Sequence, residues 1–135
     1  MIYALDTNII IHYLKPNPNV HQNMNNAIMQ GDDLVPIIVD YELRRGFRIQ
    51  HATRKEAAYE ILANQAGCCD IVEIDIQSWY RAEQVYSDLY HKKLTIGELD
   101  ILIAALCLEK GYTLVTNNTK HFQHIDGLHL VDWTM

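Results

Sequence analysis

Apolar residues follow two alternating patterns along this chain. Short apolar runs, typical of buried strands, occur at 2–5, 34–38, 71–74, 112–116 and 128–131. Longer stretches with helical spacing, together with their capping residues, occupy 7–15, 20–30, 39–50, 53–66, 79–90 and 95–110. Strands that alternate with helices predict an α/β domain built on a mostly parallel sheet.

Several of the expected elements carry signals at their ends. Segments 53–56 and 95–98 both read Thr-x-x-Glu and fit the capping box of a helix N-terminus. Gly31 and Gly111 stand where a helix would end in the left-handed conformation. Pro36 limits the extent of the second strand, because proline has no N–H to donate to a neighbouring strand.

Three acidic residues stand in apolar surroundings. Asp6 follows the run 1–5, Glu42 follows the second strand, and Asp100 lies within the apolar segment 98–108. An ionised carboxylate in such surroundings costs several kcal/mol unless a cation or hydrogen-bond donors compensate it. Functional sites of parallel sheets form beyond the carboxyl ends of the strands. We therefore expect the three acids to meet there.

Each acid also has a simpler interpretation. Asp6 suits the N-cap of the helix that follows it. Glu42 taken alone is typical of an exposed helix residue, and the capping box explains Glu98 better than a metal site does. Asp100 is hardest to explain in this way. It is expected past the cap positions, on a helix that is apolar on all sides and therefore buried.

A shared divalent cation accounts for all three acids. Carboxylates with open positions between them suit Mg²⁺ or Mn²⁺, which prefer oxygen ligands and keep several waters. Such an ion activates water and stabilises charge on a phosphodiester during its hydrolysis. Asn8 and Thr116, both near expected strand ends, are candidates to orient that water or a phosphate. As an alternative, they are ordinary turn or cap residues.

Composition limits the class of protein. The chain has 135 residues, of which 49% are hydrophobic, enough for one domain spanning 1–135. Its net charge of −6 argues against a nucleic-acid binder unless bound cations offset some of the acids. Three cysteines without framework spacing indicate reduced thiols and a cytoplasmic protein. No signal peptide or membrane-spanning run is evident.

An ordered set of short motifs runs through the chain. It consists of 2–8, 41–43 with Gly46, 100–105, 114–118 with Phe122, and 127–128 with Trp133. This set resembles the PIN domain, and within it the VapC-type ribonuclease toxins of prokaryotic toxin–antitoxin modules. The resemblance implies a three-layer α/β/α domain with a short, mostly parallel sheet. It also implies Mg²⁺-dependent endoribonuclease activity, with a specific tRNA as a plausible substrate.

The resemblance extends to partners and to individual residues. It implies a cognate antitoxin, a homodimer formed through helices, and contact with DNA only through the antitoxin. Position by position, Asp6, Glu42 and Asp100 match the metal-binding acids of the family. Thr116 matches a polar residue of the same catalytic site.

The fourth motif departs from the family pattern. Many members carry an acid just after the threonine, where this chain has Asn117 and Asn118. An asparagine brings an amide oxygen but no charge, so we expect one firmly held metal. Glu98 is the candidate to support a second metal, and Asn117 is a candidate for contact with metal or substrate. The departure also motivates an alternative function, a non-catalytic PIN-like module that binds RNA or protein.

Basic residues gather in one stretch: Arg44, Arg45, Arg48, Arg54 and Lys55. A solvated helix face is the simplest interpretation. A phosphate-contacting patch, with Arg44 and Arg45 nearest to Glu42, is the first functional alternative. A surface that meets an antitoxin segment and blocks RNA entry is the second.

Other candidate residues carry weaker signals. His121, His124 and His129 lack the helical spacing of a zinc site, and we expect them at the surface rather than as ligands or general bases. The aromatic residues of helix 79–90 are expected in the core or in a dimer interface rather than stacked on bases. A haloacid-type phosphatase would need a second Asp two residues after the first, where this chain has Asn8.

Overall fold

The computed structural model describes residues 1–15, 17–35, 39–64 and 73–135. Its elements in chain order are β1 (Ile2–Leu5), α1 (Thr7–Leu14), α2 (Pro18–Met29), β2 (Asp33–Val35), α3 (Val39–Gln50), α4 (Thr53–Ala63), α5 (Ile76–His91), α6 (Glu98–Lys110), β3 (Thr113–Val115), α7 (Thr119–Phe122) and β4 (His129–Val131).

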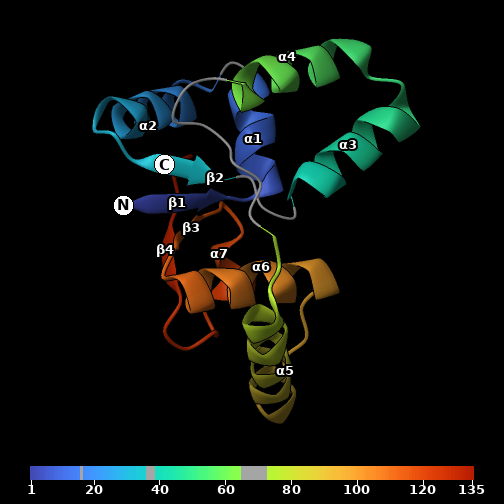
Figure 1. Ribbon diagram of the computed structural model, residues 1–135, viewed down its shortest axis with the longest axis vertical. Helices are drawn as coiled ribbons and strands as arrows, with labels where there is room; N and C mark the ends of the chain where they lie inside the picture. The colour runs from blue at the N-terminus through green and yellow to red at the C-terminus, as the bar shows by residue number, and fades with distance from the viewer. Residues whose placement is uncertain (16, 36–38, 65–72) are drawn as a thin grey trace.

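The described strands form one parallel sheet in the order β2-β1-β3-β4. In Figure 1, α1 to α4 lie above the sheet and α5 to α7 lie below it. The predicted α/β class with a parallel sheet is therefore confirmed. Because β1 and β3 are neighbours, Leu5 pairs with Val115, and the residues that follow these two strands emerge at the same edge.

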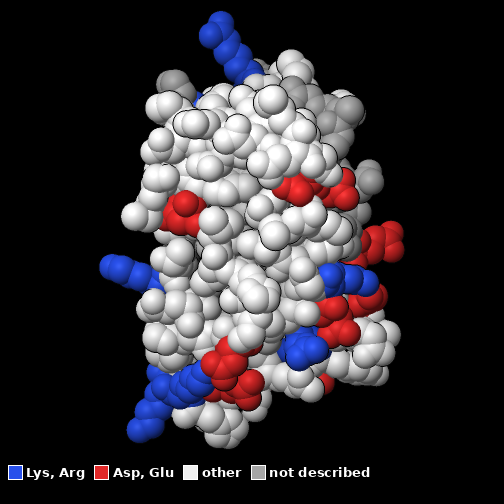
Figure 2. All heavy atoms as spheres, turned by 90° about the vertical axis from the view of Figure 1, so that its left-hand side faces the viewer, with Lys and Arg blue, Asp and Glu red and all other residues white. Residues whose placement is uncertain are grey.

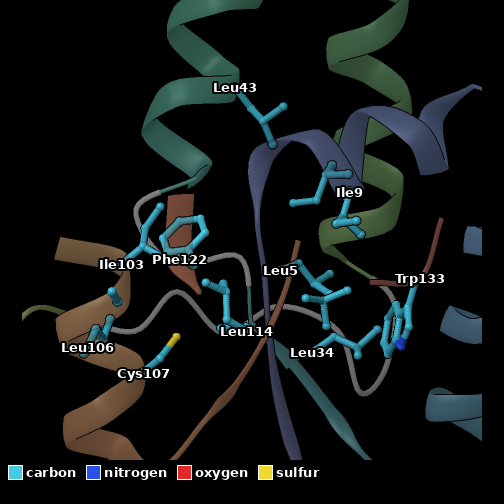
Figure 3. Close-up of a cluster of buried hydrophobic side chains, with 14 of the residues drawn as sticks. Leu5, Ile9, Leu34, Leu43, Ile103, Leu106, Cys107, Leu114, Phe122 and Trp133 are labelled. Carbon is cyan, nitrogen blue, oxygen red and sulfur yellow. The ribbon is translucent and has the colours of Figure 1, made fainter. Parts of the chain in front are cut away.

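Apolar side chains pack against both faces of the sheet. Leu5, Ile9 and Leu34 are at most 1% exposed, and α6 contributes Ile103 and Leu106, both fully buried. Figure 3 shows these side chains reaching into the core from the strands, from α1 and from α6. Burial at this level stabilises the fold by about 1.5–3 kcal/mol per large aliphatic side chain. The core thus fixes the positions of two helices near the carboxyl end of β1. Helix α1 follows this strand directly, and α6 flanks it.

Helix ends agree only in part with the sequence signals. Gly111 has the predicted left-handed conformation, with a φ of 72°. The two capping boxes are wrong, because α4 begins after Ala52 and α6 after Gly97, and neither N-cap makes a side-chain hydrogen bond. A turn with a positive φ at His51 leads straight into α4. Before α6, Leu94 and Ile96 pack against the core, and the N-cap Gly97 has an extended backbone with a ψ of 150°.

Two of the expected strands differ from the structure. The second strand is described only as Asp33–Val35, and residues 36–38 lie outside the described residues. In the expected strand 71–74, residues 71 and 72 also lie outside them, and Glu73 and Ile74 are not in a strand. A short apolar run alone is therefore not sufficient to predict a strand.

The surface carries charges of both signs. On the face shown in Figure 2, lysine and arginine side chains are scattered among aspartate and glutamate rather than gathered into one basic field. None of the described helices combines the length and apolar character that crossing a membrane requires.

Candidate active site

Asp6 stands at the junction of β1 and α1. Its Oδ1 accepts a 2.8 Å hydrogen bond from the backbone N–H of Thr7, and its Oδ2 accepts one of 2.8 Å from the Thr116 hydroxyl. The residue is 6% exposed. Burial raises the pKa of Asp6, while the bonds from Thr116 and Thr7 partly offset this increase. Asp6 is therefore the N-cap of α1 and a buried site carboxylate at the same time.

Thr116 connects the end of β3 to the site. Its side chain is fully buried, and its Oγ1 also accepts a 3.0 Å hydrogen bond from the Asn118 backbone N–H. Its own backbone N–H donates to the Val131 carbonyl at 3.0 Å. The hydroxyl thus has a donor on one side and an acceptor on the other, which holds the Asp6 carboxylate in a fixed orientation.

Glu42 and Asp100 approach Asp6 from two helices. Glu42 lies in the first turn of α3, and Asp100 lies in the first turn of α6 with a side chain that is 26% exposed. The expectation that Asp100 lies past the cap positions is wrong, because α6 begins at Glu98 and not earlier. The acid is half-buried near the helix N-terminus, where the helix dipole favours a negative charge.

The three carboxylates interact unfavourably with one another. Burial raises the pKa of Glu42, and the charges of Asp6 and Asp100 raise it further. Burial likewise raises the pKa of Asp100, and the charge of Asp6 adds to this effect. Arg45 lowers the pKa of Glu42 and His121 lowers that of Asp100, but neither neighbour outweighs burial and repulsion. A cluster of this kind is typical of a functional site.

The donor groups around this cluster fit a hard divalent cation. The Thr7 hydroxyl is buried and makes no hydrogen bond of normal length with the described residues, although it is near enough to Glu42 to lower its pKa. No three described histidine, cysteine or acidic side chains stand close enough to form a ready-made cage. Mg²⁺ needs no such cage, because it binds through one or two carboxylates and keeps its waters.

Three other predicted site residues do not join the acids. Glu98 is exposed and lines a groove beside Trp79, facing away from Asp100 because two residues of a helix differ by about 200°. Asn8 lies in the first turn of α1 and is exposed. Asn117 places its amide nitrogen 3.3 Å from a ring nitrogen of His12 on α1. Glu98 therefore lies outside the site, and Asn8 and Asn117 stand at its rim.

Arg44 and Arg45 have different surroundings. The Arg44 side chain donates to Asp40 at 3.0 Å and to Glu60 of α4, and its guanidinium also lies over the ring of Tyr59. These contacts join α3 to α4 and leave Arg44 committed to structural partners. Arg45 is exposed, with its guanidinium 5.1 Å from the centre of the Tyr41 ring.

His121 is a neighbour of the acids that the sequence signals did not identify. Its Nδ1 lies 3.8 Å from Asp100 Oδ2, and its side chain is 54% exposed. The same Nδ1 lies 2.8 Å from the side-chain nitrogen of Asn118. The one available signal is the spacing of three residues between Asn118 and His121, which puts both on one side of a helical turn.

An apolar groove opens beside the acids between α1 and α3. Its volume is about 230 Å³, and both Thr7 and Glu42 contribute to its wall. The apolar lining comprises Ile11, Leu14, Leu43 and Phe47, and the polar lining also includes Lys15, Lys55 and Gln50. A molecule seated in this groove would cover one side of the acidic cluster.

Comparison with known proteins gives matches over nearly the whole chain. A model of the PIN domain matches residues 3–128. Ribonuclease VapC2 of Rickettsia felis is 30% identical over 134 residues, which cover 98% of each chain. The tRNA(fMet)-specific endonuclease VapC of Shigella flexneri is 26% identical over 133 residues, again 98% of each chain.

A solved structure matches to the same extent. VapBC2 from Rickettsia felis, bound to a DNA fragment from their promoter, contains a chain that superposes with a TM-score of 0.88 at 26% identity. The match covers 98% of this chain and 99% of that chain. The similarity therefore includes every element that carries one of the three acids.

Proposed function

This chain belongs to the PIN domain family, and we propose that it is a Mg²⁺-dependent endoribonuclease that acts as the toxin of a toxin–antitoxin module. The observation that carries the proposal is the meeting of Asp6, Glu42 and Asp100 at one edge of the sheet, with all three pKa values raised. Its VapC relatives are ribonucleases, which supports hydrolysis of RNA in particular.

Each of the three acids has its own proposed role in such a site. When bound, Mg²⁺, or Mn²⁺ in its place, supplies an activated water and stabilises charge on the phosphodiester. Asp6 is held rigidly by Thr7 and Thr116 and anchors the cation. Glu42 and Asp100 add negative charge from the two flanking helices. Partial burial excludes water around them, which strengthens each electrostatic interaction.

RNA is the proposed substrate, and a tRNA is the proposed target class, because a relative of this chain is named a tRNA(fMet)-specific endonuclease. Arg45 is exposed beside Glu42 and is the best-placed cation to contact an RNA phosphate. Asn8 and Asn117 lie on the rim and are proposed to contact the substrate. With a tRNA as its substrate, the protein would act in the cytoplasm.

An antitoxin is the proposed protein partner, as in the VapBC complex whose toxin-like chain superposes on this one. The groove between α1 and α3 supports this proposal, since its apolar floor suits the side chains of a docked segment. A segment seated there would lie against Glu42 and obstruct access of RNA to the acids. Contact with DNA is proposed to come through the antitoxin, since the matched VapBC2 complex is bound to a DNA fragment from their promoter.

A cleavage assay tests the catalytic proposal. Purified protein is incubated with tRNA(fMet) and with a second tRNA, in Mg²⁺ and in EDTA. We expect cleavage in Mg²⁺, none in EDTA, and a loss of at least about 10²-fold in the variants Asp6→Asn and Asp100→Asn. Asp88→Asn, at an exposed position on α5, is the matched control. Activity that persists in EDTA or in both site variants contradicts the mechanism.

A non-catalytic RNA- or protein-binding module is the second candidate. It is favoured by the neutral Asn117 and Asn118 of the fourth motif. Their side-chain amides contact the rings of His12 and His121, respectively. Isothermal titration separates the two candidates. RNA binding without any Mg²⁺ or Mn²⁺ binding would favour this second function.

A homodimer is also proposed. The groove between α5 and α6 has a volume of about 330 Å³ and is lined by Trp79, Tyr86, Ile101 and Leu102 among others. Aromatic residues of this kind are enriched in the buried centres of interfaces. A second copy of the chain would cover them.

A further inference from the structure

A continuous series of polar contacts runs from Asp6 to Asp100 through the segment after β3. The Thr116 hydroxyl donates to Asp6 at 2.8 Å and accepts from the Asn118 backbone at 3.0 Å. The Asn118 amide lies 2.8 Å from His121 Nδ1, and this nitrogen lies 3.8 Å from Asp100 Oδ2. The series therefore begins on one carboxylate of the cluster and ends on another.

The fold fixes the place of the His121 ring despite its exposure. His121 belongs to α7, and the next residue, Phe122, is fully buried in the core. The preceding turn is held by the contact of Asn118 with Thr116 and by the His121 backbone N–H, which donates to the Asn118 carbonyl at 3.1 Å. The short turn that carries the ring is therefore fixed at both of its ends, and this turn borders the site.

The Asp100 carboxylate has fewer polar neighbours to orient it than the Asp6 carboxylate has. Asp6 has two hydrogen-bond donors at 2.8 Å, whereas within the described part of the chain His121 is the residue found in ion-pair range of Asp100. A proton on His121 Nδ1 would point toward the Asp100 carboxylate. If the Asn118 amide is rotated by about 180°, its oxygen also faces this proton and accepts from it. One donor would then orient both side chains.

We propose that His121, held by Asn118, is a positioning residue that orients the Asp100 carboxylate toward Asp6 for binding of a divalent cation. The inference rests on the cation site of the proposed function. It follows the general design of metal sites, in which ligand carboxylates are themselves held by hydrogen-bonding neighbours. Loss of such a neighbour typically weakens metal affinity by about 10–100-fold.

Titration of the full chain with Mn²⁺ in a calorimeter tests the role at fixed pH. We expect His121→Ala to weaken Mn²⁺ affinity by about 10-fold. His121→Asn places an amide near the former Nδ1 and should stay within about 3-fold of the wild type. His121→Gln places its amide near the former Nε2 and should resemble the alanine variant. His124→Ala, at an exposed position on the same segment, should change nothing.

A second set of measurements separates orientation from a loss of folding. The melting temperature should be the same in all four variants, because the ring is 54% exposed. Asn118→Ala should give a loss of affinity similar to that of His121→Ala, and the double variant should lose no more than either single variant. The Mn²⁺ affinity of Asn118→Ala also tests the positioning role if His121→Ala proves unstable.

Three outcomes would overturn the inference. The first is unchanged Mn²⁺ affinity in both His121→Ala and Asn118→Ala. The second is rescue of Mn²⁺ affinity by glutamine but not by asparagine, which would mean that Nε2, and not Nδ1 held by Asn118, supports the cation site. The third is absence of Mn²⁺ binding by the wild-type chain, which would overturn the proposed function as well. The first two leave the proposed function intact.

Discussion

Thr116 contributes to the site through a single hydroxyl that serves two neighbours. The group is fully buried, donates to Asp6, and accepts from the Asn118 backbone. Thr116→Val keeps the shape of the side chain but removes both bonds. Since a hydrogen bond to a charged group contributes about 1.5–3 kcal/mol, we expect the variant to lose roughly 2 kcal/mol in urea unfolding.

Thr116→Ser is the matched control, because it retains the hydroxyl. It should stay much closer to the wild type in stability and should keep RNA cleavage, which Thr116→Val should lose. Equal stability of the valine variant and the wild type would mean that the Asp6 carboxylate does not depend on this donor.

Asp100 provides a pH-dependent prediction. Its pKa is raised by burial and then by the charge of Asp6, so the folded state holds its proton more tightly than the unfolded state does. The ionised form therefore costs stability at neutral pH, and this cost fades as pH falls through the folded pKa toward 3.8. In EDTA at neutral pH, Asp100→Asn should be more stable by about 1 kcal/mol.

The control for this prediction is its dependence on pH and on metal. Melting temperatures in EDTA should show the gain of Asp100→Asn shrinking between about pH 7 and about pH 4, and Asp88→Asn should show no gain. Added Mn²⁺ should raise the melting temperature of the wild type but not that of Asp100→Asn. A variant less stable than the wild type in EDTA would show that the carboxylate is already compensated.

At the residue scale, apolar neighbours make an acid recognisable in the sequence. Asp6 and Asp100 stood out for this reason, and the structure adds that Asp6 is cap and site residue together. His121 could not be found in this way. Its proposed role rests on a 3.8 Å contact between α7 and α6, and no local sequence pattern contains such a contact.

At the scale of elements, a polar network joins α3 to α4. Arg44 donates to Asp40 and Glu60, and the Tyr59 hydroxyl donates to Asp40 at 2.7 Å. We expect Arg44→Met to lower the free energy of unfolding by about 1 kcal/mol, because the Arg44 side chain is 38% exposed and solvent weakens its ion pairs. Cleavage well below the melting temperature should be unchanged.

Arg45→Met is the matched variant for this prediction. It should leave the unfolding free energy unchanged and raise KM for RNA several-fold, because Arg45 lies exposed beside Glu42. Urea unfolding and steady-state cleavage measure both effects. The opposite assignment, with stability lost in Arg45→Met and KM raised in Arg44→Met, would restore the original expectation that Arg44 contacts RNA.

Helices were more predictable than their first residues. The predicted helix 39–50 agrees with α3 at both ends. The starts of α4 and α6 were misplaced, because Thr-x-x-Glu is a local signal and the incoming chain decides whether it is used. The start of α6 matters for the site, because it determines that Asp100 lies in the first turn, near Asp6.

At the scale of the whole molecule, topology brings the acids together. Parallel pairing of β1 with β3 puts Asp6 and Thr116 at one edge, although 110 residues separate them. The alternation of strands and helices was sufficient to predict this edge. It was not sufficient to place Glu98, because Glu98 and Asp100 both lie within α6, where residues two positions apart face different sides of the helix.

The outer face of α5 gives the last prediction. Its exposed large apolar side chains are Ile76, Trp79, Tyr80, Tyr86 and Tyr90, each between 49% and 66% exposed. At about 100° per residue these side chains fall on one side of the helix. Large exposed apolar side chains gathered in this way are uncommon on a monomer. We expect light scattering after gel filtration to give about twice the chain mass of 15.6 kDa for the wild type.

Trp79→Glu should shift this dimer to the monomer, because it would bury an unpaired carboxylate at the centre of the interface. Met29→Glu is the matched control, since Met29 is 85% exposed on α2, away from the groove between α5 and α6. A wild type that is monomeric at all concentrations would contradict the dimer. A Trp79→Glu variant that remains dimeric would place the interface on another face, because a buried glutamate at a true interface centre costs several kcal/mol.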